Sequence, residues 1–215
     1  MQVVRNMTIS AILLGLFAIL GTGLVALTFN TTKERIAENE RLTIIHSLHT
    51  LIEPKEHDND LYEDVLKVSD EALLGTADAV TIYRARSKGQ PVAAILGSVA
   101  PDGYTGRIKL LVAVRYDGTL AGVRVVSHRE TPGLGDGIEL ERSNWILGFN
   151  GKSLTNPAAK GWKVKRDGGV FDQLTGATIT PRSIVKAVHK TLQYYQQHRA
   201  TLFNTVVIEQ APKGQ

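Results

Sequence analysis

Ten residues near the C-terminal end decide how the rest of the chain is read: Asp172-Gln173-Leu174-Thr175-Gly176-Ala177-Thr178-Ile179-Thr180-Pro181. Gly176 lets the backbone turn tightly without a Cβ atom in the way. Thr180 followed by Pro181 predicts an N-cap and the first residue of a helix. The apolar residues that follow have a helical spacing and predict about five turns: Ile184, Val185, Val188, Leu192 and Tyr195.

The start of this helix is suited to an anion. A helix N-terminus has free N–H donors and partial positive charge, which favour a phosphate group. The hydroxyls of Thr175, Thr178 and Thr180 crowd the same place. Small residues and threonines before a helix are also ordinary loop and cap chemistry, so this stretch does not by itself identify a ligand site.

A second glycine-rich stretch lies about forty residues upstream: Arg129-Glu130-Thr131-Pro132-Gly133-Leu134-Gly135-Asp136. Pro132 fixes its own φ angle, and Gly133 and Gly135 can adopt positive φ. The stretch is therefore predicted to be a shaped loop. An ordinary turn from a strand to a helix has the same composition.

The middle of the chain predicts a sheet. Four strands form two hairpins with short polar turns: 79–86 with 91–99 around 87–90, and 107–115 with 119–127 around 116–118. Residues 107–115 are apolar on both faces near the centre, which indicates an interior strand. Residues 100–106, between the hairpins, contain Pro101, Gly103 and Gly106 and predict a loop.

Two further elements are predicted after the second loop. Ile138 to Phe149 has a helical pattern, and we assign its Trp145 to the core. Residues 162–165 predict a short strand that leads toward the 172–181 stretch. Lys163, Lys165 and Arg166 could offset phosphate charge, although surface solubility explains them equally well.

The N-terminal segment predicts a membrane anchor. No residue from Asn6 to Thr32 is ionisable. Its core, 7–29, spans about 35 Å as a helix, enough to cross a hydrocarbon layer of about 30 Å with some tilt. The apolar region is longer than that of a secretory signal and lacks a clear cleavage site. Lys and Arg flank it on both sides, so charge does not decide its orientation.

These patterns divide the chain into an anchor at 1–32, a helical stalk at 33–54, one domain at 55–200 and a loosely attached tail at 201–215. The stalk prediction rests on helically spaced apolar residues that end before Pro54. His46 and His49 stand at metal-ligand spacing, but no third ligand accompanies them, and we expect a solvated helix face and no metal site.

Composition excludes several functions. The chain has 215 residues and no cysteine, so disulfides, thiolate-ligated iron–sulfur clusters and haem attached at Cys-x-x-Cys-His are ruled out. The net charge of +4 comes without a basic block, so we expect no nucleic-acid partner. A redox role would need an organic cofactor or another subunit.

The two glycine-rich stretches together resemble the FMN-binding domain of the G subunit family of Rnf (Rsx) electron-transport complexes. The C subunit of the sodium-pumping NADH:quinone reductase shares this domain. The family motif Asp-x-x-(Ser/Thr)-Gly-Ala-Thr is matched by Asp172, Thr175, Gly176, Ala177 and Thr178. Its Glu-Thr-Pro-Gly-Leu-Gly signature is matched at 130–135, and its Gly-Tyr-x-Gly element at 103–106. With the anchor, the resemblance covers essentially the whole chain.

The resemblance implies FMN joined through its phosphate to Thr178. It implies a cofactor site made by the motif residues: Asp172, Thr175, Gly176, Ala177, Glu130, Thr131, Gly133, Leu134, Gly135, Gly103 and Tyr104. Tyr104 lies near the ring or only braces its loop; both interpretations stay open. Asp172 serves flavin transfer or caps its turn. The implied fold is α+β, an N-terminal transmembrane helix followed by one mixed α/β domain with an antiparallel-rich sheet.

The residues indicate how such a site would be loaded. A threonine hydroxyl is a weak nucleophile without a base, and no His or Lys stands beside Thr178. The domain is therefore expected not to attach its own flavin; the resemblance implies a separate flavin transferase. No Ser-His-Asp set, paired carboxylates or Gly-x-Gly-x-x-Gly motif is found, so we predict no catalytic residues in this chain.

The resulting hypothesis is an electron-carrier subunit, anchored in the bacterial inner membrane by one span, with its domain in the periplasm. It would work with other subunits that move electrons between ferredoxin and NAD, coupled to ion transport. One alternative is the C-type subunit of the sodium-pumping reductase. Another, of a different class, is a non-redox, membrane-anchored binding or sensing module.

Overall fold

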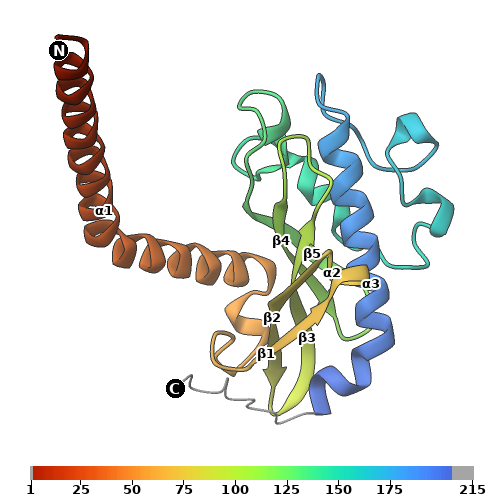
Figure 1. The fold of residues 1–215 in the computed structure, drawn as a ribbon. Helices are drawn as coiled ribbons and strands as arrows, with labels where there is room; N and C mark the ends of the chain where they lie inside the picture. Colours follow the sequence, from red (N-terminus) through yellow and green to blue (C-terminus); the bar gives the residue numbers. More distant parts are fainter. Residues whose placement is uncertain (1, 205–215) are drawn as a thin grey trace. The chain divides into compact units, whose positions relative to one another are not determined.

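The computed structural model describes residues 2–204. These divide into two compact units between Ile44 and Ile45. Figure 1 shows a long N-terminal helix and a sheet with one long helix along it. The helices are α1 (Gln2–Leu51), α2 (Glu71–Leu74) and α3 (Ile179–Asn204). The strands are β1 (Val65–Asp70), β2 (Thr76–Ser87), β3 (Gln90–Ala100), β4 (Ile108–Arg115) and β5 (Leu120–Ser127).

The sheet is a meander in the order β1-β2-β3-β4-β5, and every neighbouring pair is antiparallel. The predicted α+β class, both predicted hairpins and the interior position of β4 are confirmed. Lys88 and Gly89 both have positive φ, 51° and 76°, as a two-residue turn between right-twisted strands requires. Strand β1 and helix α2 were not predicted.

Helix α3 covers one face of the sheet. Ile184, Val188 and Leu192 are fully or almost fully buried there, and the Thr191 hydroxyl donates to the Ser98 hydroxyl of β3 at 2.8 Å. With 26 residues, α3 is longer than the predicted five turns. It includes residues 201–204, which were predicted as loose tail. Arg86 Nη2 of β2 donates to the Phe203 carbonyl at 3.0 Å and so holds the last turn. The remaining tail, 205–215, lies outside the described residues.

The end of α1 packs on the opposite face. Leu48, Leu51 and Ile52 are buried. A Cβ atom on Gly122 of β5 would lie 3.0 Å from Leu51 Cδ2, and Gly122 pairs with Ala113 on the face away from α3. The last turn of the predicted stalk therefore belongs to the domain, because the sheet has two apolar faces and each must be covered.

Among the ion pairs that tie the connection after α1 to the sheet, the one between Glu56 and Arg115 should respond to acid. Arg115 Nη1 of β4 lies 2.5 Å from Glu56 Oε2, and this hydrogen bond lowers the pKa of the Glu56 carboxyl. A carboxyl with a lowered folded-state pKa adds stability above its unfolded pKa and loses it as pH falls through the folded value. As the pH falls below 4.5, the free energy of unfolding of Glu56→Gln should therefore decrease less than that of the parent chain. Urea titrations at several pH values measure this difference. Equal acid slopes in both proteins would contradict this.

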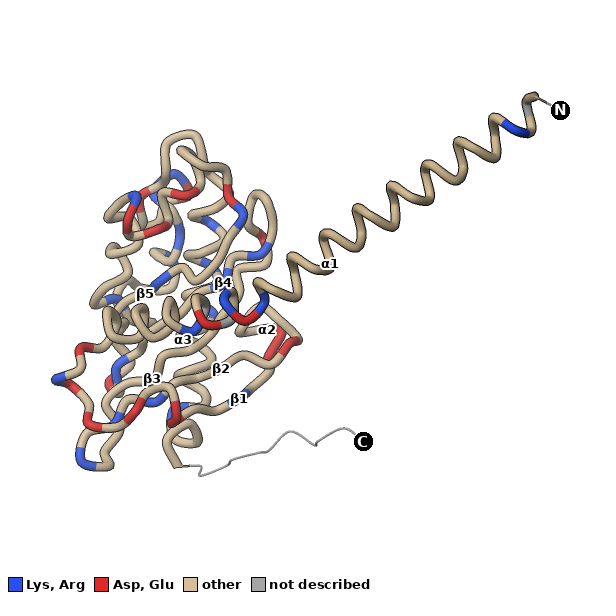
Figure 2. The backbone as a smooth tube through the Cα atoms, turned by 90° about the vertical axis from the view of Figure 1, so that its left-hand side faces the viewer, with Lys and Arg blue, Asp and Glu red and all other residues tan. Residues whose placement is uncertain are grey.

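The first part of α1 is a candidate membrane span. It is the one described helix that is long and apolar enough to cross a membrane, by length and composition. Figure 2 shows a long stretch of α1 without charged residues. Its large side chains, such as Leu14, Phe17 and Leu24, are exposed in the single chain. Lipid would cover these apolar side chains. A helix can lie in lipid because its backbone hydrogen bonds are made within the helix.

Two element predictions were wrong. Residues 138–149 do not form one helix; 3-10 turns at Gly135–Ile138 and Asn144–Phe149 replace it. Ser143 breaks the pattern, because its hydroxyl donates to the Gly137 carbonyl and accepts from Trp145 N–H. Residues 162–165 do not form a strand, since they have only the Val164–Phe171 bridge inside a tight loop. That loop nevertheless fills the core, with Phe149 and Phe171 rings stacked at 4.7 Å.

Candidate functional site

Three connections meet at one end of the sheet. The register pairs Ala100 with Ile108 and Lys109 with Ser127, so the β3–β4 loop and the segment after β5 leave the sheet at the same edge. The loop before α3 reaches this edge as well. Lys186 Nζ of α3 lies 2.8 Å from Asp102 Oδ2 of the β3–β4 loop. Stretches far apart in the sequence are thereby brought together.

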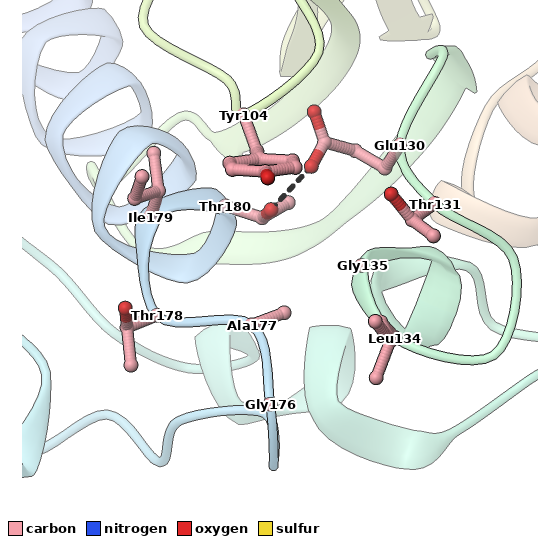
Figure 3. A pocket seen from close by; sticks show the side chains of 10 residues that line it. All are labelled: Tyr104, Glu130, Thr131, Leu134, Gly135, Gly176, Ala177, Thr178, Ile179 and Thr180. Carbon is pink, nitrogen blue, oxygen red and sulfur yellow. Dashed lines mark hydrogen bonds between the residues drawn. The ribbon is translucent and has the colours of Figure 1, made fainter.

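A cavity of about 310 Å³ lies between these three connections. Figure 3 shows the residues around it: Tyr104, Glu130, Thr131, Leu134, Gly135, Gly176, Ala177, Thr178, Ile179 and Thr180. None of the ten is Lys or Arg. The volume is at the small end of ligand sites in proteins, roughly 300–1,000 Å³. It suits part of a cofactor, with the rest toward solvent.

Eight of the twelve predicted site residues line this cavity: Thr178, Gly176, Ala177, Glu130, Thr131, Leu134, Gly135 and Tyr104. Four do not: Asp172, Thr175, Gly133 and Gly103. Ile179 and Thr180 line it and were absent from the predicted set. They could have been predicted from the sequence, because both residues directly follow the Thr-Gly-Ala-Thr motif at the start of the helix.

Glu130 is the buried charged group of the cavity, with 4% of its surface exposed. Its Oε1 accepts from Thr105 N–H at 3.1 Å, and its Oε2 accepts from the Thr180 hydroxyl. Its own N–H donates to His128 Nδ1 at 2.9 Å. Among the described residues no ion pair to Glu130 is formed. Hydrogen bonds, not a cation, therefore offset the cost of burying this carboxylate.

Two glycines lie closely against Glu130 and its loop. A Cβ atom on Gly103 would lie 2.2 Å from the Gly106 carbonyl oxygen and 2.9 Å from Glu130 Oε1, and one on Gly135 would lie 2.9 Å from Glu130 Cβ and from Glu130 Oε2. Gly135 does not use the positive φ open to it; its role is close packing. Gly133 and Gly176 do have positive φ, 76° and 79°.

The three threonines differ in access. Thr175 is exposed and outside the cavity, Thr180 is 1% exposed and bonded to Glu130, and Thr178 is half-buried and lines the cavity. The predicted cap is wrong by two residues, because α3 begins at Ile179. Thr178 is thus the residue immediately before the helix, next to its free N–H groups.

The groups around the 172–178 loop tie it to the fold. Lys165 Nζ lies 2.5 Å from Asp172 Oδ1, with both side chains mostly exposed. Neither Lys163 nor Arg166 lines the cavity. Trp145 packs edge-on against Phe149, and its Nε1–H donates to the Asp172 carbonyl at 2.7 Å. Trp145 is thus only partly buried and packs against the core, not inside it as predicted; it also fixes the start of the loop.

Trp145→Phe tests this anchor. The phenyl ring keeps the contact with Phe149 but loses the Nε1–H donor, so we expect a stability loss of about 1 kcal/mol. Hydrogen exchange should become faster in the 172–178 loop. The matched control is Trp162→Phe, which removes the 3.2 Å bond from Nε1 to the Ser153 carbonyl. Unchanged exchange in Trp145→Phe would show that this bond does not hold the loop.

Comparison with known proteins identifies the family of the chain. A family model described as FMN-binding domain matches residues 103–193, which include all three connections, and one described as RnfG N-terminal region matches residues 1–51. The chain is similar to the G subunit of the ion-translocating oxidoreductase complex of Vibrio cholerae, 48% identical over 91% of this chain and 93% of the relative. The corresponding protein of Pseudomonas aeruginosa is 51% identical over 92% of each chain.

A third such relative, from Shewanella loihica, is 48% identical over 93% of this chain and 94% of its own length. The similarity covers the apolar N-terminal helix as well as the domain with the cavity. The chain belongs to the G subunit family of ion-translocating oxidoreductase complexes, as its motifs predicted.

Proposed function

We propose that the cavity holds the isoalloxazine end of FMN and that Thr178 bears its phosphate in a phosphoester bond. The observation that supports this choice is the difference among the three threonines. Thr178 alone of the three both lines the cavity and remains half-exposed. A hydroxyl that must be reached by a second protein needs such a position.

The cavity has the chemistry of a flavin site. Tyr104, Leu134 and Ile179 offer an aromatic ring and two aliphatic side chains to the flat faces of a ring system. The start of α3 offers N–H groups to a phosphate at Thr178. Glu130 lies on the other side of the cavity from Thr178 in Figure 3. Its charge repels phosphate, so the phosphate belongs at Thr178 and the ring toward Glu130.

FMN, the cofactor of the matched domain, supplies one- and two-electron chemistry when bound. As a member of the G subunit family, this chain is a component of an ion-translocating oxidoreductase complex. We propose that it accepts and passes on single electrons on the route between ferredoxin and NAD, whose sites lie on other subunits. It needs no substrate-converting site of its own.

The flavin is attached by a separate transferase in this proposal. The carboxylate in the cavity wall is bonded to Thr180, not to Thr178, so none of the cavity-lining residues is a base placed to activate Thr178. Asp172, exposed beside the motif, is available to the transferase. The apolar helix crosses the bacterial inner membrane once, and the domain works in the periplasm, where a covalent bond prevents loss of the flavin.

The test is to express the full chain with and without a flavin transferase, then separate it on a denaturing gel and image it under ultraviolet light. We expect a fluorescent band only with the transferase, and a peptide around Thr178 heavier by the mass of an FMN ester. No fluorescence, while a known covalent flavoprotein is labelled in the same cells, would overturn the proposal.

A further inference from the structure

Glu130 has an arrangement that flavin attachment does not explain. It is almost fully buried, lines the cavity, and has no ionic partner among residues 2–204. Two donors hold its oxygens: Thr105 N–H on Oε1 and the Thr180 hydroxyl on Oε2. The Thr105 hydroxyl lies 3.3 Å from Oε1 but donates its one proton to the Arg129 carbonyl. A peptide N–H can only donate, so this oxygen is held as an acceptor.

The groups around Glu130 match an ionised carboxylate, whose oxygens only accept hydrogen bonds. Thr105 N–H and the Thr180 hydroxyl both donate to it. Thr180 lies in the first turn of α3, where the partial positive charge of the helix also favours an anion. Gly103 and Gly135 let two loop backbones close around the oxygens, which excludes solvent from that side. The result is a fixed negative charge in a site with little screening.

We infer that Glu130 lowers the reduction potential of the flavin bound in this cavity by opposing the negative charge that reduction adds. The inference rests on the proposed function. An electron taken from another redox centre of the complex brings one negative charge to the ring unless a proton follows it. A buried carboxylate at the cavity wall raises the energy of that state and leaves the neutral oxidised ring nearly unaffected.

The titratable groups around Glu130 include a cation, Arg142, which lies beside Asp136. Tyr104 lines the same cavity from the β3–β4 loop. His128 accepts from the Glu130 N–H, and its Nε2 lies 2.8 Å from Glu139 Oε1. Asp136, buried in the same loop, lies 3.6 Å from Arg142 Nε. The net charge of this group of side chains is not positive enough to neutralise the carboxylate at the cavity wall.

The experiment is a spectroelectrochemical titration of the full chain in detergent, loaded by co-expression with a transferase, for the parent and Glu130→Gln. The amide keeps the shape and removes the charge. We expect Glu130→Gln to raise the first-electron midpoint potential by at least about 59 mV, a tenfold change in that equilibrium. The pKa of the reduced ring should fall, so the potential should stop depending on pH at a lower pH than in the parent.

Asp136→Asn is the matched control. It also removes a buried carboxylate from the same loop, but Asp136 does not line the cavity and has Arg142 beside it. Its first-electron midpoint potential should differ from the parent's by no more than about one third of the shift found for Glu130→Gln, because a paired charge outside the cavity is partly cancelled. Equal shifts in both variants would overturn a specific role for Glu130.

A second readout does not depend on the variant's folding. In the parent chain, the reduced-minus-oxidised infrared difference spectrum should contain a shifted carboxylate band. A spectrum without any carboxylate change would overturn the inference, as would a Glu130→Gln potential equal to the parent's. In either case a fluorescent, covalently loaded parent chain would leave the proposed function standing. A parent chain that carries no flavin would instead overturn the proposed function itself.

Discussion

Thr178→Val is expected to reduce covalent flavin to the background seen without a transferase. Valine has nearly the shape of threonine, so the half-buried side chain still fits the loop. The phosphoester bond, however, needs the hydroxyl oxygen that valine lacks. Fluorescence of the denatured band, normalised to protein stain, measures the loss, and the mass of the 178-containing peptide verifies it.

Thr175→Val is the matched control for Thr178→Val. It removes a hydroxyl three residues away, in the same loop, from a side chain that is exposed and outside the cavity. Its fluorescence should equal that of the parent chain. A fluorescent Thr178→Val band would mean that another threonine is modified; because Thr180 is buried against Glu130, Thr175 would then be examined first.

Gly75→Ala is expected to be strongly destabilising. Gly75 ends α2 with φ of 77°, and a Cβ atom there would lie 2.0 Å from the Val99 carbonyl oxygen of β3. The neighbour is backbone of a central strand, which cannot move aside. We expect a loss of about 4 kcal/mol or more, the range reached by few single substitutions. The thermal midpoint should fall by roughly 8–16 °C for a chain of this size.

Gly89→Ala separates the cost of the left-handed backbone conformation from the cost of the clash with Val99. Gly89 has almost the same φ, 76°, but nothing lies within 4 Å of its Cβ position. It should lose only the cost of the left-handed conformation, about 1 kcal/mol. Both tryptophans lie in the domain, so their fluorescence reports its unfolding without a signal from α1. A similar loss in both variants would show that the Val99 contact relaxes at little cost.

Local patterns were sufficient for much of the fold. The hairpin turns, the interior strand, the long apolar segment and the helix after the motif could all be predicted, because each depends on residues adjacent in the chain. The errors fall where distant contacts compete with a local pattern. In 138–149 the Ser143 hydroxyl bonds to Gly137 and ends a helical pattern. Residues 201–204 stay helical because Arg86 of β2 holds the last turn.

For the site, the sequence by itself determined the motif loops, eight cavity residues and the family to which the chain belongs. Only the tertiary structure decided what each residue does there. It separates three nearby threonines into exposed, half-buried and buried positions. It also joins Glu130 to Thr180, fifty residues apart, in one hydrogen bond. Burial and long-range pairing depend on how the sheet edge brings loops together, and no local spacing contains that information.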